Sequence, residues 1–261
     1  MSTTGAWSSY ERRLVPRLAA PFAVEIAREL AGALPGRLVV DVAAGTGATG
    51  VAVAMAQPGA LTLSVDLDET ALAVGRDVGR ATGLSVAGDA MRLPVRTGVA
   101  AAVVCQQGLQ FVPDLDLVCT EARRVLLPGG RLVALTWADL EDVCVLASLS
   151  ELADSLGVGP AFRDPCSLGP ARLADALAGA GLVVATQRTI SATLAGCETA
   201  ADVADLLAHW VDASDNALID PWRRADQATR DRWITRFGDG LVRRQGRLIA
   251  VLTVASDPGT A

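Results

Sequence analysis

The chain has 261 residues, a length typical of one large α/β domain. Apolar residues make up 51% of it and charged residues 20%, which excludes disordered and low-complexity proteins. The 29 acidic residues outnumber the 23 basic ones, giving a net charge of −6. Because the chain is acidic and has no basic stripe, nucleic-acid binding is not expected. Every basic residue is arginine. With no lysine, one histidine and one tyrosine, the chemistry must need few titratable side chains.

No feature of the sequence indicates a membrane protein or a metal protein. Its apolar runs are shorter than the about 18 residues that a membrane span requires. The N-terminal residues lack the basic-then-apolar order of a signal peptide. The five cysteines form no C-x-x-C pair and have no histidine near them. We therefore expect a cytoplasmic monomer or homodimer that binds a small molecule, with no metal, membrane or nucleic-acid partner.

The first half of the chain alternates predicted strands and helices. Residues 7–35 are expected to be helical, with interruptions at Pro16, Pro21 and Pro35. Short, β-branched apolar runs are typical of strands buried on both faces, and they occur at 37–42, 61–66, 84–89, 99–105 and 131–137. Helical stretches lie between them at 48–57, 68–82 and 114–127. This order predicts a parallel sheet with helices on both faces and a ligand at the carboxyl ends of the strands.

The second half departs from this alternation. Helical segments near 139–157 and 170–180 precede a strand at 182–190, and the last apolar run lies at 247–256. The region between these strands, residues 196–244, contains the single histidine and three of the tryptophans. We interpret it as a helical substrate lid within one domain that spans residues 1–261, after an N-terminal helical cap (1–36) and a cofactor-binding core (37–137).

A glycine-rich turn, DVAAGTGATG at residues 41–50, ends the first predicted strand. Its glycines let the backbone approach a ligand, and the following helix offers free N–H groups. The spacing of Gly45, Gly47 and Gly50 matches a dinucleotide-binding fingerprint, although a plain strand-to-helix turn shows it too. Asp41 would repel a pyrophosphate but suits a ligand with a cationic amino-acid end.

Acidic residues also end the next two predicted strands. Asp66 can accept hydrogen bonds from both hydroxyls of a ribose, which nicotinamide and S-adenosyl ligands share, and Asp68 is expected to cap the next helix. Asp89 ends the third predicted strand, in the segment GDAMRLP. The sequence therefore predicts a nucleoside ligand at this edge of the sheet.

These motifs resemble the class I S-adenosylmethionine-dependent methyltransferases, specifically the small-molecule methyltransferases typified by the ubiquinone-biosynthesis enzymes. The family motif is an acid followed by x-G-x-G-x-G, and Ala43 replaces its first glycine here. The segments CQQGLQF at 105–111 and EARRVLLPGG at 121–130 also match the family, from Tyr10 to about Trp137. The resemblance implies a Rossmann-like, seven-stranded, mostly parallel sheet whose last strand is antiparallel, with N-terminal helices and a helical lid inserted before that strand.

The same resemblance implies the site. Asp89, Ala90 and Met91 would bind the adenine, and Tyr10 would lie on a helix that closes over the cofactor, or else simply pack. Gln106 and Gln107 would bond the cofactor or the substrate, or else be exposed amides. The implied cofactor-binding residues are Tyr10, Asp41, Ala43, Gly45, Gly47, Asp66, Leu67, Asp89, Ala90, Met91, Gln106 and Gln107. The implied substrate-binding residues are Gln110, Trp137 and Trp210.

Methyl transfer from a sulfonium is an in-line displacement, which positioning and exclusion of water can support without charged catalysts. Where the acceptor must lose a proton, His209 is the expected general base, oriented by Asp205 one helical turn away. A packing or lid-surface role for this histidine is the alternative. The predicted function is methylation of a small, largely apolar or aromatic metabolite, as in natural-product biosynthesis. A cyclase on the same fold, a nicotinamide-dependent oxidoreductase or a non-catalytic nucleotide-binding module are the other hypotheses.

Overall fold

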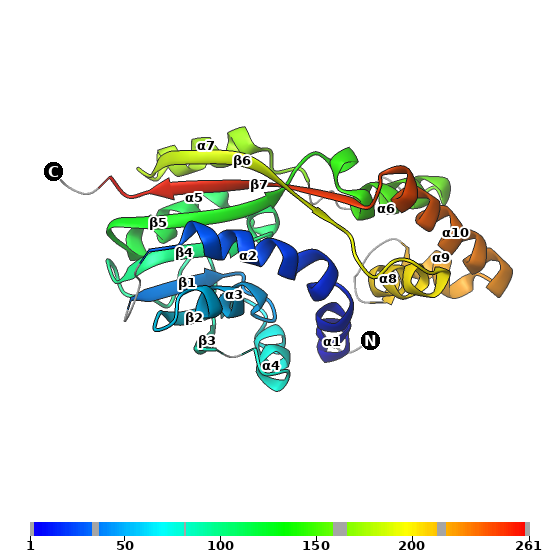
Figure 1. The fold of residues 1–261 in the computed structure, drawn as a ribbon, viewed down its shortest axis with the longest axis horizontal. Coiled ribbons are helices and arrows are strands. Elements are labelled where there is room, and N and C mark those ends of the chain that lie inside the picture. The colour runs from blue at the N-terminus through cyan, green and yellow to red at the C-terminus, as the bar shows by residue number, and fades with distance from the viewer. Residues whose placement is uncertain (1–2, 33–36, 81, 159–165, 213–217, 259–261) are drawn as a thin grey trace.

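The computed structural model describes residues 3–32, 37–80, 82–158, 166–212 and 218–258, and among these a seven-stranded sheet has the order β3-β2-β1-β4-β5-β7-β6 (Figure 1). Its strands are β1 (Leu38–Val42), β2 (Leu61–Asp66), β3 (Leu84–Ala87), β4 (Ala100–Gln106), β5 (Leu126–Trp137), β6 (Val183–Thr193) and β7 (Arg247–Ser256). β7 runs antiparallel to β5 and β6, and the remaining pairs are parallel. The predicted sheet is therefore confirmed, including its antiparallel last strand.

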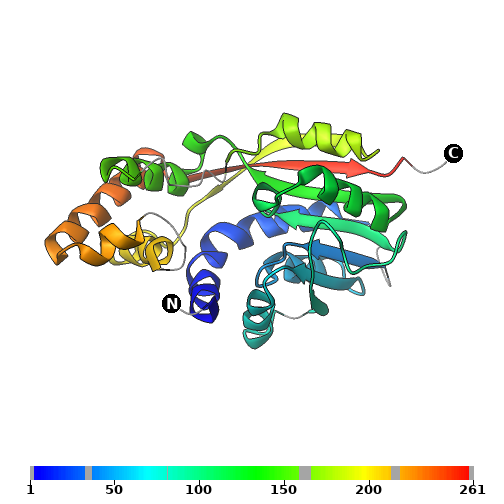
Figure 2. The ribbon, with the colours of Figure 1, turned by 180° about the vertical axis from the view of Figure 1, so that it is seen from behind.

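Helices cover both faces of this sheet. The α-helices are α1 (Thr3–Arg13), α2 (Ala20–Glu29), α3 (Ala48–Ala56), α4 (Glu69–Asp77), α5 (Leu115–Val125), α6 (Cys144–Ser155), α7 (Pro170–Gly179), α8 (Ala200–Asp212), α9 (Ile219–Arg224) and α10 (Gln227–Arg243). A π-helical segment, η1 (Val15–Ala19), joins α1 to α2, and the 3-10 turns η2 (Leu109–Phe111) and η3 (Leu140–Asp142) follow β4 and β5. Helices α2 and α3 lie on one face, and α5 and α7 on the other (Figures 1 and 2).

The strands bury side chains on both faces, as their continuous apolar runs predict. Along β4, Ala102 and Val104 belong to the core beneath α2 and α3, whereas Val103 and Cys105 belong to the core beneath α5 and α7. Neighbouring side chains of a strand point to opposite faces, so one strand contributes to two cores. The sheet is thus fixed between two apolar layers, and its loops can carry the polar residues.

Several predicted boundaries are corrected by the structure. The helix expected over 68–82 ends at Asp77 because Gly79, with φ +79°, turns the backbone out of the helix. The helical region after β5 splits into η3 and α6, and β5 itself begins at Leu126, five residues before the predicted strand. The N-terminal helix is interrupted by η1, which contains Pro16. Pro35 lies outside the described residues.

The predicted lid contains α8, α9 and α10, and α6 joins them. Figure 1 shows these four helices gathered where β6 ends and β7 begins. Helices α6 and α10 approach closely at Gly240, where a Cβ atom would lie 2.4 Å from Ser148 Oγ. Helix α1 contacts α4 of the sheet domain and α8 of the lid. No described helix is both long and apolar enough to cross a bilayer.

Candidate functional site

A cavity of about 460 Å³ opens at the carboxyl ends of β1, β2 and β4. The chain leaves β1 toward β2 on one side and returns to β4 on the other, and ligands of open α/β sheets bind at such a reversal of strand order. Its wall combines the loops after these strands with residues of α1 and η1. The predicted site residues that line it are Tyr10, Ala43, Gly45, Asp66, Leu67, Asp89, Ala90, Met91, Gln106, Gln107, Gln110 and Trp137.

The glycine-rich turn brings backbone close to the cavity. Gly45 and Gly47 have φ values of +57° and +86°, which favour glycine, and Gly47 caps α3. Ala43 replaces the first glycine of the family motif yet also lies in this region, with φ +54°. A Cβ atom on Gly108 would lie 2.5 Å from Cβ of Ala43 and clash with it. The side chain of Ala43 is therefore accommodated because residue 108 is glycine. Gly47 itself does not line the cavity, and it acts through the shape of the turn.

Asp41 stabilises this turn through a hydrogen bond. Its Oδ2 atom accepts a hydrogen bond from the Gly50 N–H at 3.0 Å, whereas Oδ1 is buried with no partner among the described residues. Burial raises the pKa of Asp41 to about 7. Because Asp41 is not part of the cavity wall, its direct contact with a cationic ligand stays a prediction.

Asp66 is fixed at the tip of β2 by two backbone donors. Its Oδ2 accepts from the Gly45 N–H at 2.7 Å and its Oδ1 from the Asp68 N–H at 2.9 Å. Each carboxylate oxygen retains a second lone pair, so the group can still accept from ribose hydroxyls. Burial raises the pKa of Asp66. Asp68 caps α4 as predicted, accepting from the Thr70 N–H, and also accepts from Trp7 Nε1 at 2.6 Å.

The segment after β3 forms the adjoining part of the wall. Asp89 Oδ1 accepts from the Met91 N–H at 2.8 Å, which fixes the carboxylate beside the cavity. Gly88, Ala90 and Met91 also line this part. A carboxylate, exposed backbone and an apolar side chain in sequence suit an adenine ring, which offers an amino donor, ring acceptors and flat faces.

The two glutamines after β4 have different surroundings. Gln106 Nε2 donates to the Ala19 carbonyl at 2.7 Å and Gln106 Oε1 accepts from Thr49 Oγ1 at 2.9 Å, so this amide joins η1 and α3 to β4. Gln106 also lines the cavity, and its binding role stays a prediction. Gln107, with φ +54°, has an Nε2 atom without a partner among the described residues.

Helix α1 contributes residues that sequence reasoning missed. Trp7 lines the cavity beside Tyr10, with ring centroids 5.3 Å apart. The buried Glu11 accepts from Thr46 Oγ1 at 2.5 Å and from Arg80 Nε at 2.6 Å. Burial, reinforced by Glu11, raises the pKa of Tyr10 to about 12, so its hydroxyl stays protonated. These contacts join residues 35 and 69 positions apart, and no local motif signals such pairs.

The predicted general base lies one layer behind the wall. His209 is buried, its Nδ1 lies 3.0 Å from Ser9 Oγ, and its ring centroid lies 6.1 Å from that of Tyr10. It does not line the cavity. Burial and the charge of Arg13 lower the pKa of His209 to about 4, and Asp205 forms an ion pair with Arg13 at 2.5 Å. This position favours the packing alternative, and a catalytic role stays a prediction.

The remaining substrate residues fall in different places. Trp137 lines the cavity, and its ring packs edge-on against Phe22 at 5.6 Å between centroids. Gln110 lines it as well. Trp210 lies on α8, but its side chain lies outside the described residues.

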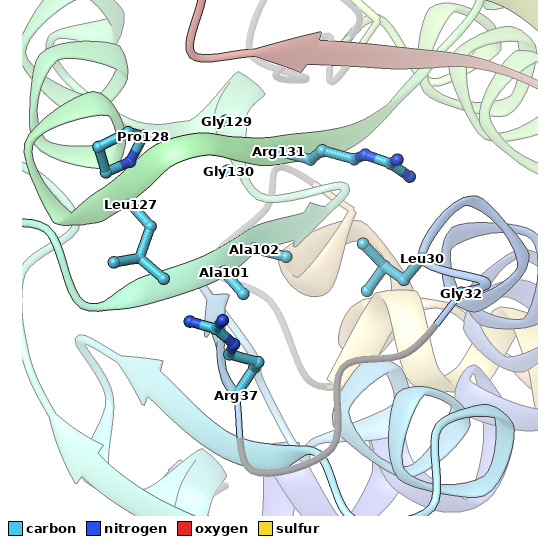
Figure 3. Close-up of a pocket in the computed structure, with 10 residues that line it drawn as sticks. All are labelled: Leu30, Gly32, Arg37, Ala101, Ala102, Leu127, Pro128, Gly129, Gly130 and Arg131. Atoms are coloured by element: carbon cyan, nitrogen blue, oxygen red, sulfur yellow. The ribbon is translucent and has the colours of Figure 1, made fainter. Parts of the chain in front are cut away.

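A second, smaller pocket of about 240 Å³ lies at the opposite edge of the sheet. It is formed where β1 and β4 begin and by the turn of Pro128 to Gly130 within β5 (Figure 3). Arg37 and Arg131 line it, and Arg131 Nη1 donates to the Glu29 carbonyl at 3.2 Å. None of the predicted site residues lies here, so the two pockets are separate.

The comparisons with known proteins agree with this geometry. Residues 40–134 match the family described as a methyltransferase domain. The ubiquinone/menaquinone biosynthesis C-methyltransferase UbiE of Caulobacter sp. (strain K31) is 36% identical over 114 residues, which cover 40% of this chain and 45% of that protein. The chain thus spans less than half the length of the curated relatives it matches.

Two solved structures show the same fold over most of the chain. A geranyl diphosphate methyltransferase in complex with SAM superposes with a TM-score of 0.55 and 18% identity, covering 92% of this chain and 86% of that one. The [4+2]-cyclase SpnF superposes with a TM-score of 0.59 and 20% identity, covering 93% and 82%. At these identities the likeness concerns the fold.

The residues present fit S-adenosylmethionine. Asp66 suits the ribose, Asp89 to Met91 suit the adenine, and the turn at Ala43 to Gly45 exposes backbone beside them. The orphaned Oδ1 of Asp41 beneath the same turn adds a negative group near the expected position of the amino-acid end. Residues 40–134 therefore match a methyltransferase domain, and the cavity beside them has residues that suit S-adenosylmethionine.

Proposed function

We propose that the protein transfers the methyl group of S-adenosylmethionine to a small, uncharged, largely apolar or aromatic molecule. One observation carries this proposal: the wall of a single cavity combines two carboxylates, Asp66 and Asp89, which backbone donors hold in place, with side chains that are otherwise uncharged and largely apolar. Cofactor and acceptor can thus lie next to each other in one cavity, as transfer requires.

The cofactor side is built from Asp66, Asp89 and the glycine-rich turn. When bound there, S-adenosylmethionine supplies an electrophilic methyl group on a positively charged sulfur. The protein holds the nucleoside by hydrogen bonds, and the carboxylates are kept in place by backbone donors. Such preorganised groups need no rearrangement when the ligand binds.

The acceptor side is apolar apart from amides. Leu14, Leu18, Phe111, Val112 and Trp137 line the cavity. Among the described residues of the whole wall, the titratable side chains are Tyr10, Asp66 and Asp89. None of them is a neutral base beside the acceptor, so the side chains act by orienting the nucleophile and excluding water.

The relatives support an aromatic acceptor. One is named for ubiquinone and menaquinone biosynthesis, whose products carry an aromatic or quinone ring. The match to the methyltransferase domain covers residues 40–134 and does not include the lid, and the apolar residues of the cavity wall indicate the acceptor class. A ring-containing metabolite, quinone-like or another natural product, fits the apolar side.

Thermal unfolding with added nucleotides tests the cofactor. We expect S-adenosylhomocysteine at about 100 times its Kd to stabilise the protein by about 2.7 kcal/mol, and NAD to have no effect. Stabilisation by NAD alone would overturn the proposal. A parallel incubation with methyl-labelled S-adenosylmethionine and aromatic metabolites should then yield a labelled product and S-adenosylhomocysteine in equal amounts.

The cyclase alternative has one specific observation in its favour, the fold shared with SpnF. A cyclase would bind the cofactor without consuming it. The same incubation therefore separates the two functions, because a cyclised product of unchanged mass, without release of S-adenosylhomocysteine, supports the alternative.

A further inference from the structure

The side-chain amide of Gln110, on the cavity wall, has no hydrogen-bond partner among the described residues. Both the Nε2 and the Oε1 atom of Gln110 are sheltered from solvent, and neither has a partner among the described residues. The same holds for Nε2 of Gln107. Both residues line the cavity. Because most buried polar atoms in native proteins are bonded, such an amide needs an explanation.

The neighbouring Gln106 shows that this segment can satisfy an amide. Its two polar atoms bond Ala19 and Thr49, which belong to the chain itself. The amide of Gln110 has no such partner among the described residues. Because its two polar atoms are sheltered from solvent, the amide must turn into the cavity before a bound molecule can complete it.

The backbone around Gln110 is fixed while its amide can turn. The N–H of Gln107 donates to the Leu135 carbonyl at 2.7 Å, and Gly108 packs against Ala43, which leaves no room for a side chain. Gln110 follows in the short turn η2. The last side-chain torsion of glutamine is broad, so a small rotation can present the amide to a ligand.

We propose that Gln110, assisted by Gln107, determines acceptor specificity, and that the acceptor is a neutral apolar molecule whose edge carries a hydrogen-bond donor and an acceptor on neighbouring atoms. An amide, a lactam or a catechol has such an edge. This inference rests on the proposed function and names its substrate class.

The complementarity follows from the chemistry of the amide. An amide donates through nitrogen and accepts through oxygen. Neither atom of Gln110 has a partner among the described residues, so the amide can offer a donor and an acceptor in either orientation of the group. A ligand that only accepts hydrogen bonds would leave Oε1 of Gln110 buried and unpaired. A ligand that only donates hydrogen bonds would leave Nε2 of Gln110 buried and unpaired. Either case loses affinity because the unmade bond is costly.

Charge on the ligand is disfavoured by the surroundings. The charged side chains that line the described wall are Asp66 and Asp89, both acidic. A carboxylate would meet no cationic side chain on the described wall, and only the nitrogen of the Gln110 amide could donate to it. The acceptor side therefore selects for a neutral edge rather than an acid.

A series of ligands with one apolar body tests the inference. The full chain, saturated with S-adenosylhomocysteine, is titrated by calorimetry with 2-naphthamide, 2,3-dihydroxynaphthalene, 2-acetonaphthone, 2-naphthoate and naphthalene. We expect the amide or the catechol to bind at least about 10-fold more tightly than the acceptor-only ketone and the carboxylate. Which of the two binds better distinguishes an amide edge from a catechol edge.

Substitution of Gln110 supplies the matched comparison. Gln110→Leu and the longer Gln110→Met should lose the preference for the donor-acceptor edge while binding S-adenosylhomocysteine with wild-type affinity. Gln227→Leu, an exposed position of α10, is the control and should keep the preference. Retained cofactor affinity shows that a variant is folded.

Equal affinities across the series in the wild type, failure of both edge ligands to bind, or a preference that survives in both Gln110 variants would overturn the inference. Failure of S-adenosylhomocysteine itself to bind would instead overturn the proposed function. The two failures are therefore distinguishable.

Discussion

The cofactor side and the acceptor side of the cavity differ in whether the chain itself supplies hydrogen-bond partners for their polar side chains. On the cofactor side, Asp66, Asp89 and Gln106 are held by hydrogen bonds from the chain. On the acceptor side, the amide of Gln110 has no partner among the described residues. The carboxylates and the Gln106 amide of the cofactor side are thus held by the chain, apart from Oδ1 of Asp41, whereas we propose that the Gln110 amide is completed by the acceptor.

Removing the charge of Asp66 should have the largest effect on cofactor affinity. In Asp66→Asn, the amide nitrogen faces one of the backbone N–H groups that now donate to the carboxylate. We expect the Kd for S-adenosylhomocysteine to rise at least about 100-fold, measured by calorimetry. An affinity within a few-fold of wild type would mean that the ribose is bound elsewhere.

Asp41 should make stability depend on pH. Its pKa is about 7 in the folded protein and 3.8 ordinarily, so between these values the folded protein binds one more proton than the unfolded chain. The free energy of unfolding therefore falls as pH rises through this window and levels above it. Asp41→Asn cannot titrate and should remove roughly 2 kcal/mol of the fall between pH 5 and 8, in urea unfolding without ligand. Parallel pH profiles of the two proteins would contradict this.

Gly108→Ala tests the contact that shapes the cofactor turn. The new Cβ would lie 2.5 Å from Cβ of Ala43 and 3.0 Å from Cys105 Sγ. We expect a loss of about 2 kcal/mol in the free energy of unfolding. Ala43→Gly removes the first clash, so the double variant should recover part of the loss. Additive effects in the double-mutant cycle would show that the two residues do not compete for space.

Glu11→Gln tests whether the contacts of α1 with the cofactor turn are independent of its contacts with the lid. It removes the charge that accepts from Arg80 and Thr46, so α1 should hold the cofactor turn less firmly. We expect about 10-fold weaker binding of S-adenosylhomocysteine. Arg13→Gln is the matched change on the lid side, where Arg13 pairs with Asp205, and it should leave this affinity unchanged. Equal losses in both variants would show that α1 acts as one unit.

His209 should have the smallest effect on chemistry. Since it lies behind Tyr10, His209→Gln is expected to change kcat/KM for an accepted substrate by less than about 3-fold. The melting temperature of the His209→Gln variant should fall because a buried contact with Ser9 is altered. A loss of about 100-fold in kcat at unchanged stability would restore the general-base role.

Much of the cofactor side could be predicted from the sequence. The strands are short apolar runs, and each is followed directly by its functional residues, so Asp66 and Asp89 could be placed at the same edge of the sheet. The glycines of the turn were predictable for the same local reason. Gln106 was placed correctly on the wall, but its bonds to Ala19 and Thr49 depend on helices distant in sequence.

The sequence by itself determined the order of strands and helices, the glycine-rich turn and the acidic residues that follow β2 and β3, because these signals lie within a few residues of one another. Only the tertiary structure decided that Glu11 fastens α1 to the turn, that His209 lies behind Tyr10, and that the amide of Gln110 has no described partner. Those facts depend on contacts between distant segments, and side-chain pairing across such distances follows from packing rather than from local pattern.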